Sequence, residues 1–333
     1  MWILGIETSC DETAAALFNA PAPSFTEKVA RQFATHAPYR GVVPELASRC
    51  HLETISRLVH AACADAGIGP ADIGLVAATS GPGLAGALIV GLSYAKALAL
   101  ALNRPFVAVN HIEAHMYAAA AETDIPFPFL ALVVSGGHTL LADIHDVSSF
   151  DILGRTRDDA AGEAFDKGAA VLGLGFPGGQ ALEEAAKGGN PKAVPFPRGM
   201  AGDAPDFSFS GLKTALLYFM QRTPNAPLAD VAASYQEAIV DVLVRKTIAA
   251  ATRRGRSSIV VGGGVAANGR LRALLQAHGK HGFRIVFPSV ALCTDNARMI
   301  AHRGLALFDA RGASPLDADI FPALNFRYKD GIS

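Results

Sequence analysis

The sequence predicts an α/β protein with open sheets in two lobes, and three observations carry the prediction. At 333 residues the chain is about twice the usual domain length, so two domains or lobes are expected. Half of the residues are apolar and only 18% are charged, which supports sizeable cores. Short apolar, strand-like runs alternate with helical patterns, and each run ends in a Gly-rich or polar turn. Sheets of this kind bind ligands beyond the carboxyl ends of their strands, where these turns lie.

The expected elements follow in chain order. Strand-like runs occupy residues 2–7, 73–80, 129–134 and 257–261. Helical patterns occupy residues 44–66, 84–102, 112–121, 160–172, 229–253 and 268–278. A strand followed by a Gly-rich or polar turn occurs early, centrally and late, which suits two related lobes with a cleft between them. The apolar run 84–102 is long enough to span a membrane, but Lys96 and two glycines interrupt it, so we expect a buried helix and no membrane partner.

Charge and cysteine usage narrow the function classes. With 29 basic and 30 acidic residues the net charge is −1, whereas a protein that grips a polyanion unaided usually carries a basic excess. A nucleic-acid substrate would therefore meet a local basic patch or be held partly by another protein. The densest basic cluster, which is more often a solvated helix end than an RNA contact, comprises Arg245, Lys246, Arg253, Arg254 and Arg256. The four cysteines form no C-x-x-C pair and the N-terminus is unlike a signal peptide, so we expect a reduced, cytoplasmic compartment.

The segment HIEAH, residues 111–115, is the strongest candidate for a metal site. Four residues along a helix bring two side chains to within about 40° of each other, so His111 and His115 share a face. In metalloproteases of the H-E-x-x-H type the glutamate directly follows the first histidine, whereas Glu113 lies about 200° away on the far side. Histidines without a metal are the alternative. The candidates for a third ligand are Asp11, Asp166 and Asp295, and such a set suits Fe(II) as well as Zn(II).

Three glycine-rich turns are candidates for binding phosphate. GPGLAG (81–86) and GGGVAA (262–267) each follow a strand and precede a helix, but neither has the acid about 20 residues later that a dinucleotide fold uses for the ribose. There is no P-loop pattern. Free N–H groups at the helix starts still favour a phosphate or nucleotide, the alternative being glycines needed only for tight turns. SGGH (135–138) lets backbone approach a ligand closely, or is an ordinary hairpin turn.

For two acidic segments the sequence permits both a functional and a structural interpretation. ETSCDET (7–13) places three carboxylates and several hydroxyls directly after the first strand. It could hold phosphate oxygens or a metal-bound water, or it could cap a helix. GEAFDK (162–167) places Glu163 and Asp166 on one helical face at i, i+3, which is most often a solvated face.

Ten segments, taken in order, resemble one family: GIETSCDET, GVVPELASR, GPGLAGALIVGLSYAKALA, NHIEAHMYA, LVVSGGHT, GEAFDKGA, FPGG, FSFSGLKTA, VGGGVAANGRLR and CTDNARMIA. The chain is similar over residues 3 to about 301 to the bacterial tRNA N6-adenosine threonylcarbamoyltransferases, formerly described as O-sialoglycoprotein endopeptidases. The resemblance implies an actin/Hsp70/sugar-kinase-like (ASKHA) fold with a nucleotide cleft between its lobes. One lobe would be 1–110 with a returning C-terminal helix in about 296–333. The other, about 111–295, would carry the metal and nucleotide-binding turns.

The resemblance also implies a reaction and its residues. Threonylcarbamoyl-AMP would donate its threonylcarbamoyl group to N6 of the adenosine 3′ of the anticodon, in tRNAs that read codons beginning with A. The implied ligands of one divalent ion, Fe(II) first and Zn(II) as the alternative, are His111, His115 and Asp295. The implied donor-binding residues are Val134, Ser135, Gly136, Gly137, His138, Asp166, Gly179, Glu183 and Asn268. Glu183 stands where the family often has Asp, and Asp11 matches an acid opposite the metal that we take as a candidate general base.

The resemblance further implies protein partners, namely an inactive paralogue that forms a heterodimer with the enzyme and a small ATPase. Three other functions are weighed against it. A small-molecule carbamoyl-adenylate transferase or kinase of the same fold would share the nucleotide turns. A metalloprotease would share the histidine pair but fails on the position of Glu113. A non-catalytic, nucleotide-gated scaffold would have no reason to keep all three metal positions.

Overall fold

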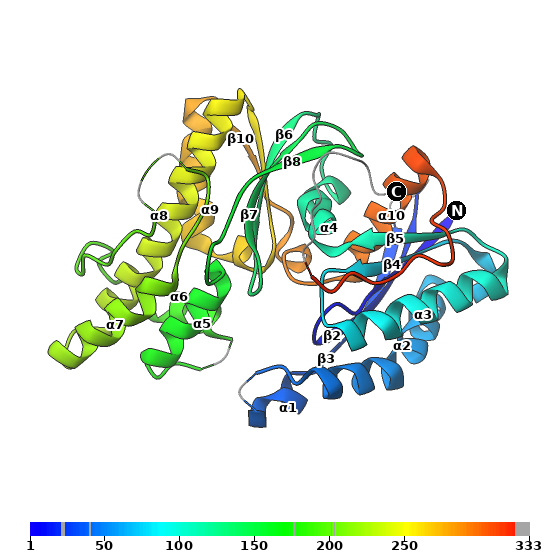
Figure 1. Cartoon of the computed structure of the whole chain (residues 1–333), viewed down its shortest axis with the longest axis horizontal. Helices are drawn as coiled ribbons and strands as arrows, with labels where there is room; N and C mark the ends of the chain where they lie inside the picture. The colour runs from blue at the N-terminus through cyan, green and yellow to red at the C-terminus, as the bar shows by residue number, and fades with distance from the viewer. Residues whose placement is uncertain (21–23, 40, 176, 201, 203, 324–333) are drawn as a thin grey trace. The chain divides into compact units, whose positions relative to one another are not determined.

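The computed structural model describes residues 1–20, 24–39, 41–175, 177–200, 202 and 204–323 (Figure 1). The chain divides into two compact units, residues 1–121 with 295–333, and residues 122–294. The boundary differs from the expected one, because the helix that starts at His111 and the residue Asp295 belong to the first unit. The metal positions therefore lie in the first unit and not in the second. Residues 324–333 of the expected first lobe, and Phe176 of the FPGG segment, lie outside the described residues.

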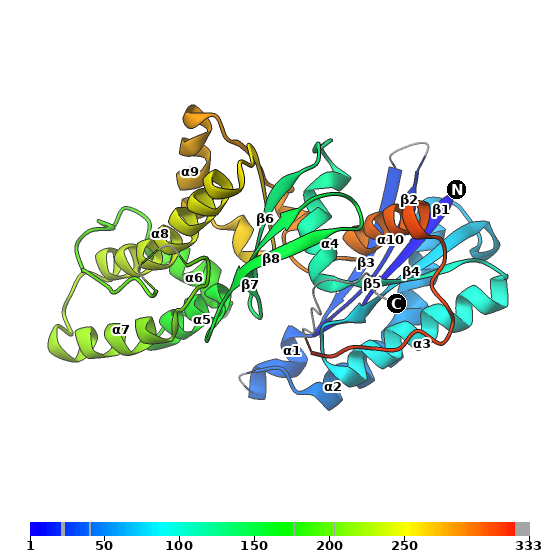
Figure 2. The ribbon, with the colours of Figure 1, turned by 45° about the horizontal axis from the view of Figure 1, so that its top comes forward.

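The sheet of the first unit has the strand order β3-β2-β1-β4-β5 (Figure 2). Its strands are β1 (Trp2–Glu7), β2 (Glu12–Asn19), β3 (Ser24–Arg31), β4 (Ile73–Gly81) and β5 (Phe106–Asn110). β1, β2 and β3 form an antiparallel meander, while β4 and β5 run parallel to β1. β1 and β4 are almost continuously apolar, because helices cover both faces of the sheet.

The helices of the first unit are α1 (Phe33–His36), α2 (Pro44–Ala66), α3 (Ala85–Leu102), α4 (His111–Tyr117) and α10 (Ala297–Arg311). α2 and α3 bury one face of the sheet, where Leu92 packs in the same cluster as Ile6. α4 and α10 bury the other face, and Met299 is part of that cluster. α10 lies directly on β1, since a Cβ at Gly5 would come within 2.2 Å of the carbonyl oxygen of Ala297.

Helix α3 is long and apolar enough to cross a membrane by length and composition, alone among the helices of the described residues. It packs instead against β4 and α2, and its Lys96 Nζ donates to the Ala318 carbonyl over 2.7 Å. The expected burial holds for one face only, because Ile89 and Leu100 on the other side are 52% and 68% exposed. α3 therefore belongs to the core of the first unit along a single stripe.

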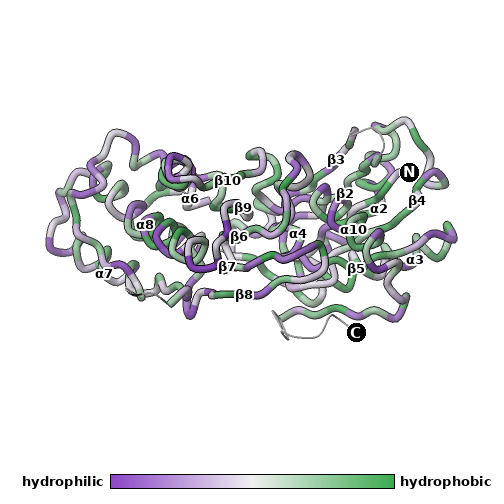
Figure 3. Tube along the Cα trace, turned by 90° about the horizontal axis from the view of Figure 1, so that it is seen from above, coloured by the Kyte–Doolittle hydropathy of each residue, from purple (hydrophilic) through white to green (hydrophobic). Residues whose placement is uncertain are grey.

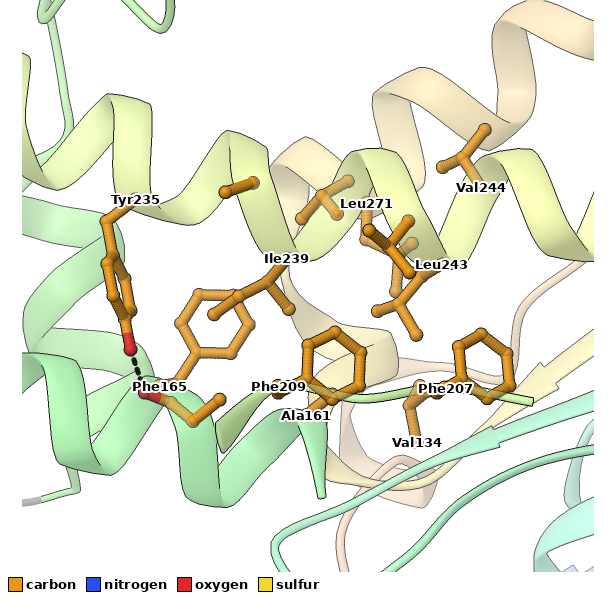
Figure 4. Close-up of a cluster of buried hydrophobic side chains, with 14 of the residues drawn as sticks. Val134, Ala161, Phe165, Phe207, Phe209, Tyr235, Ile239, Leu243, Val244 and Leu271 are labelled. Carbon is orange, nitrogen blue, oxygen red and sulfur yellow. Dashed lines mark hydrogen bonds between the residues drawn. The ribbon is translucent and has the colours of Figure 1, made fainter. Parts of the chain in front are cut away.

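The second unit is built around another five-stranded sheet and the long helix α8 (Leu228–Arg254). Its strands are β6 (Phe129–Val134), β7 (Thr139–Ile144), β8 (Phe150–Arg155), β9 (Ser258–Gly262) and β10 (Arg284–Val286). Its other helices are α5 (Ala161–Val171), α6 (Gly178–Ala185), α7 (Ser210–Arg222) and α9 (Gly269–Ala277). Figure 4 shows Tyr235 and Ile239 of α8 pointing toward Phe165 of α5, with the Tyr235 hydroxyl donating to the Ala164 carbonyl over 2.9 Å.

The two sheets repeat one topology, which confirms the expectation of two related lobes. Read from β8, the second sheet has the order β8-β7-β6-β9-β10, the counterpart of β3-β2-β1-β4-β5. β6, β7 and β8 are antiparallel, and β9 and β10 run parallel to β6. Figure 3 colours the trace of both units by hydropathy, and strands of both sheets contribute to the buried clusters, for example Leu4 of β1 and Leu132 of β6. Each turn of one unit therefore has a counterpart in the other.

Candidate metal centre and nucleotide-binding turns

Three of the expected metal ligands converge in the first unit. The candidate ligand atoms of His111, His115 and Asp295 all lie within 4.8 Å of one another. Asp295 Oδ1 is 3.1 Å from Nε2 of His115 and 3.5 Å from Nε2 of His111. The two ring centroids are 4.7 Å apart, and the rings are perpendicular. Two imidazole nitrogens and a carboxylate oxygen could hold one Fe(II) or Zn(II) and leave further coordination positions open.

Two helix starts present these ligands. α4 begins at the end of β5, where the Asn110 side chain accepts hydrogen bonds from the backbone N–H groups of Ile112 and Glu113 over 2.8 and 3.2 Å. Asp295 stands one residue before Asn296, whose side chain caps α10 by accepting from Met299 N over 2.8 Å. Each ligand is thus fixed by a capped helix end. Among the described residues, Asp11 and Asp166, the other candidates for the third ligand, do not join this group.

Glu7, the first carboxylate of ETSCDET, is a further residue of the site, and nothing in the sequence indicated its contact with His111. It is fully buried at the end of β1, and its Oε2 accepts from His111 Nδ1 over 3.0 Å and from the Thr79 hydroxyl over 2.6 Å. Its Oε1 accepts from the backbone N–H of Ser9 over 2.5 Å. A carboxylate on Nδ1 orients the ring and leaves the lone pair of Nε2 toward the ligand position. The contact spans 104 positions of the chain, so no local pattern could reveal it.

The buried charges around His111 suit a cation at this place. Burial alone would lower the pKa of His111, but the carboxylates of Glu7 and Asp295 outweigh it and raise the pKa to about 9. Burial would likewise raise the pKa of Glu7, yet the neighbouring His111 holds it below its usual value. A ligand imidazole must be neutral, so a metal binding here at neutral pH displaces a proton.

The ETSCDET segment forms the β1–β2 hairpin and does not cap a helix. Glu12 opens β2 two residues before Ala14, which packs on Ala297, so Glu12 faces the same side as the start of α10. Burial and the charge of Asp295 raise the pKa of Glu12 to about 7, against the lowering effect of Arg31. The hairpin therefore places a carboxylate that titrates near neutrality in the electrostatic field of the metal-ligand group.

The GPGLAG turn of the first unit is occupied by the chain itself. Gly81 has φ +151°, and a Cβ there would come within 2.2 Å of the Phe321 carbonyl oxygen. The N–H of Gly83 donates to the Pro322 carbonyl over 3.2 Å, and the N–H of Leu84 donates to the Ser9 carbonyl over 2.8 Å. These N–H groups are not available to a phosphate. Gly81 and Gly83 are therefore needed for a tight, closely packed turn, whereas a phosphate at the start of α3 stays a prediction.

The corresponding turns of the second unit face open space. SGGH is the β6–β7 hairpin turn, closed by a bond of 2.8 Å from Ser135 N to the His138 carbonyl. A Cβ added to Gly136, Gly137 or Gly264 would meet no atom within 4 Å. Gly263, by contrast, has φ +89°, and its Cβ would come within 2.4 Å of the Val134 carbonyl oxygen. Gly263 thus allows the turn after β9 to pack against the end of β6, whereas the other three glycines leave room for a ligand.

The remaining expected donor-binding residues form hydrogen-bonded pairs in the second unit. Asn268 caps α9 and donates through Nδ2 to Gln236 over 2.8 Å and to Glu183 over 3.2 Å. Glu183 also accepts from Gly269 N over 2.8 Å. Asp166 accepts from the backbone N–H of Gly178 over 2.9 Å, beside Gly179. Burial raises the pKa of Asp166, although the backbone N–H groups of Gly178 and Gly179 act in the opposite direction.

The two carboxylates of GEAFDK have different surroundings. Asp166 joins α5 to the start of α6, whereas the Glu163 side chain is 46% exposed and pairs with Lys167 over 2.9 Å. Glu163 therefore shows the solvated-face behaviour expected of the spacing, and Asp166 does not.

The basic cluster near the end of α8 is largely engaged within the second unit. Arg256 binds both carboxylate oxygens of the fully buried Asp143 over 2.6 and 3.0 Å, and Arg254 lies 3.9 Å from the same carboxylate. Lys246 is buried and donates to the Ala204 carbonyl over 2.6 Å. Arg245, Lys246 and Arg253 line a small cavity together with residues 202, 204 and 205. Most of the cluster therefore has a structural role.

A duplicated five-stranded mixed sheet with glycine-rich strand-end turns defines the actin-like, ASKHA class. Two solved structures share this fold. HypF from T. kodakarensis has a TM-score of 0.64 at 13% identity, over 93% of this chain and 48% of HypF. The activator of 2-hydroxyisocaproyl-CoA dehydratase from Clostridium difficile has a TM-score of 0.53 at 13% identity, over 96% of this chain and all of that chain. This chain spans about half of the length of HypF, so the likeness concerns one part of that protein.

Sequence comparison identifies the family. The family model TsaD, tRNA N6-adenosine threonylcarbamoyltransferase, matches residues 25–302. The enzyme of that name from Anaeromyxobacter dehalogenans (strain 2CP-C) is 52% identical over 95% of this chain and 98% of its own length. The one from Thermotoga neapolitana is 50% identical over 91% of this chain and 93% of its own length. The chain belongs to the TsaD family, and it is a transferase that modifies tRNA, as the resemblance of its segments implied.

Proposed function

We propose that this protein transfers the threonylcarbamoyl group of threonylcarbamoyl-AMP to N6 of the adenosine 3′ of the anticodon, in tRNAs that read codons beginning with A. The observation that carries the proposal is the near-full-length identity of about half with enzymes of that name. In this step the N6 amine attacks the carbamoyl carbon, the bond between that carbon and the phosphate oxygen breaks, and AMP leaves. The amine loses one proton.

The donor nucleotide is assigned to the second unit. Val134, Ser135, Gly136, Gly137 and His138 form the turn between β6 and β7, and the open space beside its glycines suits a phosphate or ribose approached by backbone N–H groups. Asn268 and Glu183 hold each other at the start of α9, where they can take the ribose hydroxyls. Asp166 and Gly179 complete the set at the start of α6.

One divalent ion is assigned to His111, His115 and Asp295 in the first unit, with Fe(II) favoured and Zn(II) as the alternative. The converging nitrogen and carboxylate donors and the Glu7 contact on His111 support this ligand set. When bound, such an ion supplies charge neutralisation for a phosphate or polarisation of the carbonyl under attack. The chain's own contribution is to hold the ligands and to keep His111 in the tautomer that presents Nε2.

The acceptor is an aromatic amine and a poor nucleophile, so positioning and activation of the electrophile should dominate. Asp11 is proposed as the general base for the N6 proton, because it stands in the hairpin that directly follows β1. If Asp11→Asn binds the donor normally and keeps the full single-turnover rate, this role is wrong. Glu12→Gln should be measured beside it, since Glu12 has a pKa of about 7 and lies on the same hairpin.

The proposal includes partners for tRNA binding. A net charge of −1 and a basic cluster that is largely engaged predict weak binding of tRNA by the isolated chain. We therefore infer that an inactive paralogue, forming a heterodimer with this chain, and a small ATPase help to present the tRNA, in the cytoplasm where tRNA is modified. Tight binding of tRNA by the isolated chain at high salt would contradict this.

The test of the function is product identity. Purified chain, its partner proteins, synthetic threonylcarbamoyl-AMP and unmodified tRNA are combined, and the tRNA nucleosides are analysed by mass spectrometry. Threonylcarbamoyladenosine at the position 3′ of the anticodon is expected. Transfer to a small-molecule amine but not to tRNA would favour a carbamoyl-adenylate transferase of the same fold. Peptide cleavage is not expected, because Glu113 pairs with Arg303 over 2.7 Å and does not join the metal ligands.

A further inference from the structure

A buried ion pair lies behind the metal-ligand helix. Glu113 stands between the two histidines in sequence, and its Oε2 accepts from Arg303 Nη2 of α10 over 2.7 Å. The two side chains are 6% and 1% exposed. The Arg303 guanidinium also lies over the ring of Tyr117, 4.0 Å from its centroid. One arginine of α10 therefore contacts two successive turns of α4, from the side opposite His111.

The spacing along α4 explains why this contact bears on the ligands. Glu113 and Tyr117 are four residues apart and share one face, just as His111 and His115 share the other. α4 has only seven residues, and all of them are buried. Because the helix is so short, the contacts of Arg303 with Glu113 and Tyr117 fix the rotation of α4 about its axis. The same contacts therefore fix the direction of both imidazoles.

The same arginine belongs to the helix that follows the third ligand. Arg303 stands six residues after Ala297, the first residue of α10, and so about 9 Å along that helix. The start of α10 is held independently, since Glu27 Oε1 of β3 accepts from the backbone N–H groups of Ala297 and Arg298 over 2.8 and 3.3 Å. With its start anchored to β3 and its second turn bound to α4, α10 fixes the distance from Asp295 to the histidines.

A buried ion pair is a costly way to add stability, because apolar side chains of similar volume serve equally well. What a planar guanidinium adds is direction: its hydrogen bond and its stacking on a ring both require one orientation. We propose that Arg303, through Glu113 and Tyr117, is a positioning residue that sets the mutual orientation of His111, His115 and Asp295 and thereby the affinity for the metal. This inference rests on the proposed metal centre.

The test measures Co(II) binding and thermal stability on four proteins. Co(II) is a spectroscopic probe for sites of this ligand type, and its dissociation constant is obtained by competition with a chelator well below the melting temperature. The variants are Arg303→Met, the double variant Glu113→Met/Arg303→Met, and the control Arg256→Met. The control is matched, because Arg256 also binds a buried carboxylate, Asp143, but in the second unit.

We expect Arg303→Met to lower the melting temperature and to weaken Co(II) binding by about tenfold or more. The double variant should regain thermal stability because no unpaired carboxylate remains buried, yet its Co(II) affinity and visible spectrum should stay altered. The control should lose stability and bind Co(II) like the wild type. Recovery of Co(II) affinity together with stability in the double variant, or unchanged affinity in Arg303→Met, would overturn the positioning role. Absence of Co(II) binding by the wild type would instead overturn the metal centre on which it rests.

Discussion

The two units share one sheet topology but equip their corresponding turns in opposite ways. After β1 the first unit has a hairpin rich in carboxylates, whereas after β6 the second unit has Ser135 to His138 with two open glycines. In the turn after β4 the N–H groups of Gly83 and Leu84 are bound by the chain itself, whereas the turn after β9 keeps Gly264 open. One topology therefore presents two kinds of candidate site, a proposed metal site made of side chains and a proposed nucleotide site made largely of backbone.

The largest effect is expected at Gly263, where the turn after β9 packs against the end of β6. Gly263→Ala should lower the free energy of unfolding by about 3 kcal/mol, because alanine is strained at φ +89° and its Cβ would meet the Val134 carbonyl. Denaturant unfolding measures this. The matched control Gly264→Ala has open space and an ordinary φ, so it should fold like the wild type. Equal losses in both variants would contradict the distinction between a glycine needed for packing and one that leaves room for a ligand.

In the first unit the candidate site depends on a buried side chain, that of Glu7. Glu7→Ala should weaken metal binding about tenfold to 100-fold, because His111 loses the acceptor that orients its ring. Glu7→Gln keeps an acceptor oxygen and should lose less. Chelator competition gives both affinities. An unchanged affinity in Glu7→Ala would show that the ring orientation does not depend on this carboxylate.

The first unit should also respond to acid through His302 of α10. Burial, followed by the charges of Arg298 and Arg303, lowers the pKa of His302 to about 4. Because the folded-state pKa lies below the ordinary value, folding favours the neutral ring. This stability is present above about pH 6.5 and is lost as the pH falls toward 4.

The expected loss is on the order of 2 kcal/mol, with allowance for the partial exposure of the ring. It is measured as the difference in free energy of unfolding between pH 7 and pH 4.5. His302→Gln, which does not titrate, should show a smaller pH dependence than the wild type. An identical pH dependence in the two proteins would rule out His302 as the source.

The smallest effect concerns the exposed carboxylate of α5. Glu163→Gln should change the free energy of unfolding by less than about 0.5 kcal/mol, because its pair with Lys167 is at the surface. Asp166→Asn, on the same helical face, should weaken donor binding, because Asp166 fixes the start of α6. Titration of the two variants with AMP checks the contrast. Equal AMP affinities would remove Asp166 from the nucleotide site.

The sequence predicted long amphipathic elements well and short or evenly apolar ones poorly. The expected helix 44–66 has the bounds of α2, because Pro44 starts it and Gly67 ends it with φ +67°. β2 was not predicted, since its run of alanines carries no strand signal. α10 was expected only through the family resemblance, as a returning C-terminal helix in about 296–333, and not from its own hydrophobic pattern. The expected lobe boundary failed at α4, because its attachment to α10 depends on contacts between distant positions.

The convergence of the candidate ligands was predictable in part. The histidine pair at i, i+4 was a candidate metal site beside the alternative of histidines without a metal. The family resemblance singled out Asp295, which the structure brings next to both histidines. Glu7 and Arg303 act through contacts that span 104 and 190 positions, so neither could be read from a local pattern. The GPGLAG and GGGVAA turns look alike in sequence, and the structure distinguishes them by the segment at Phe321 and Pro322 that packs on the first.

The most direct test of the account joins metal content to transfer. Wild type and His111→Ala/His115→Ala are purified in parallel, their metal content is determined, and each is given the partner proteins, threonylcarbamoyl-AMP and unmodified tRNA. We expect the wild type to hold about one ion per chain and to form threonylcarbamoyladenosine, and the variant to lose metal and transfer together. Full transfer by a variant without metal would contradict it.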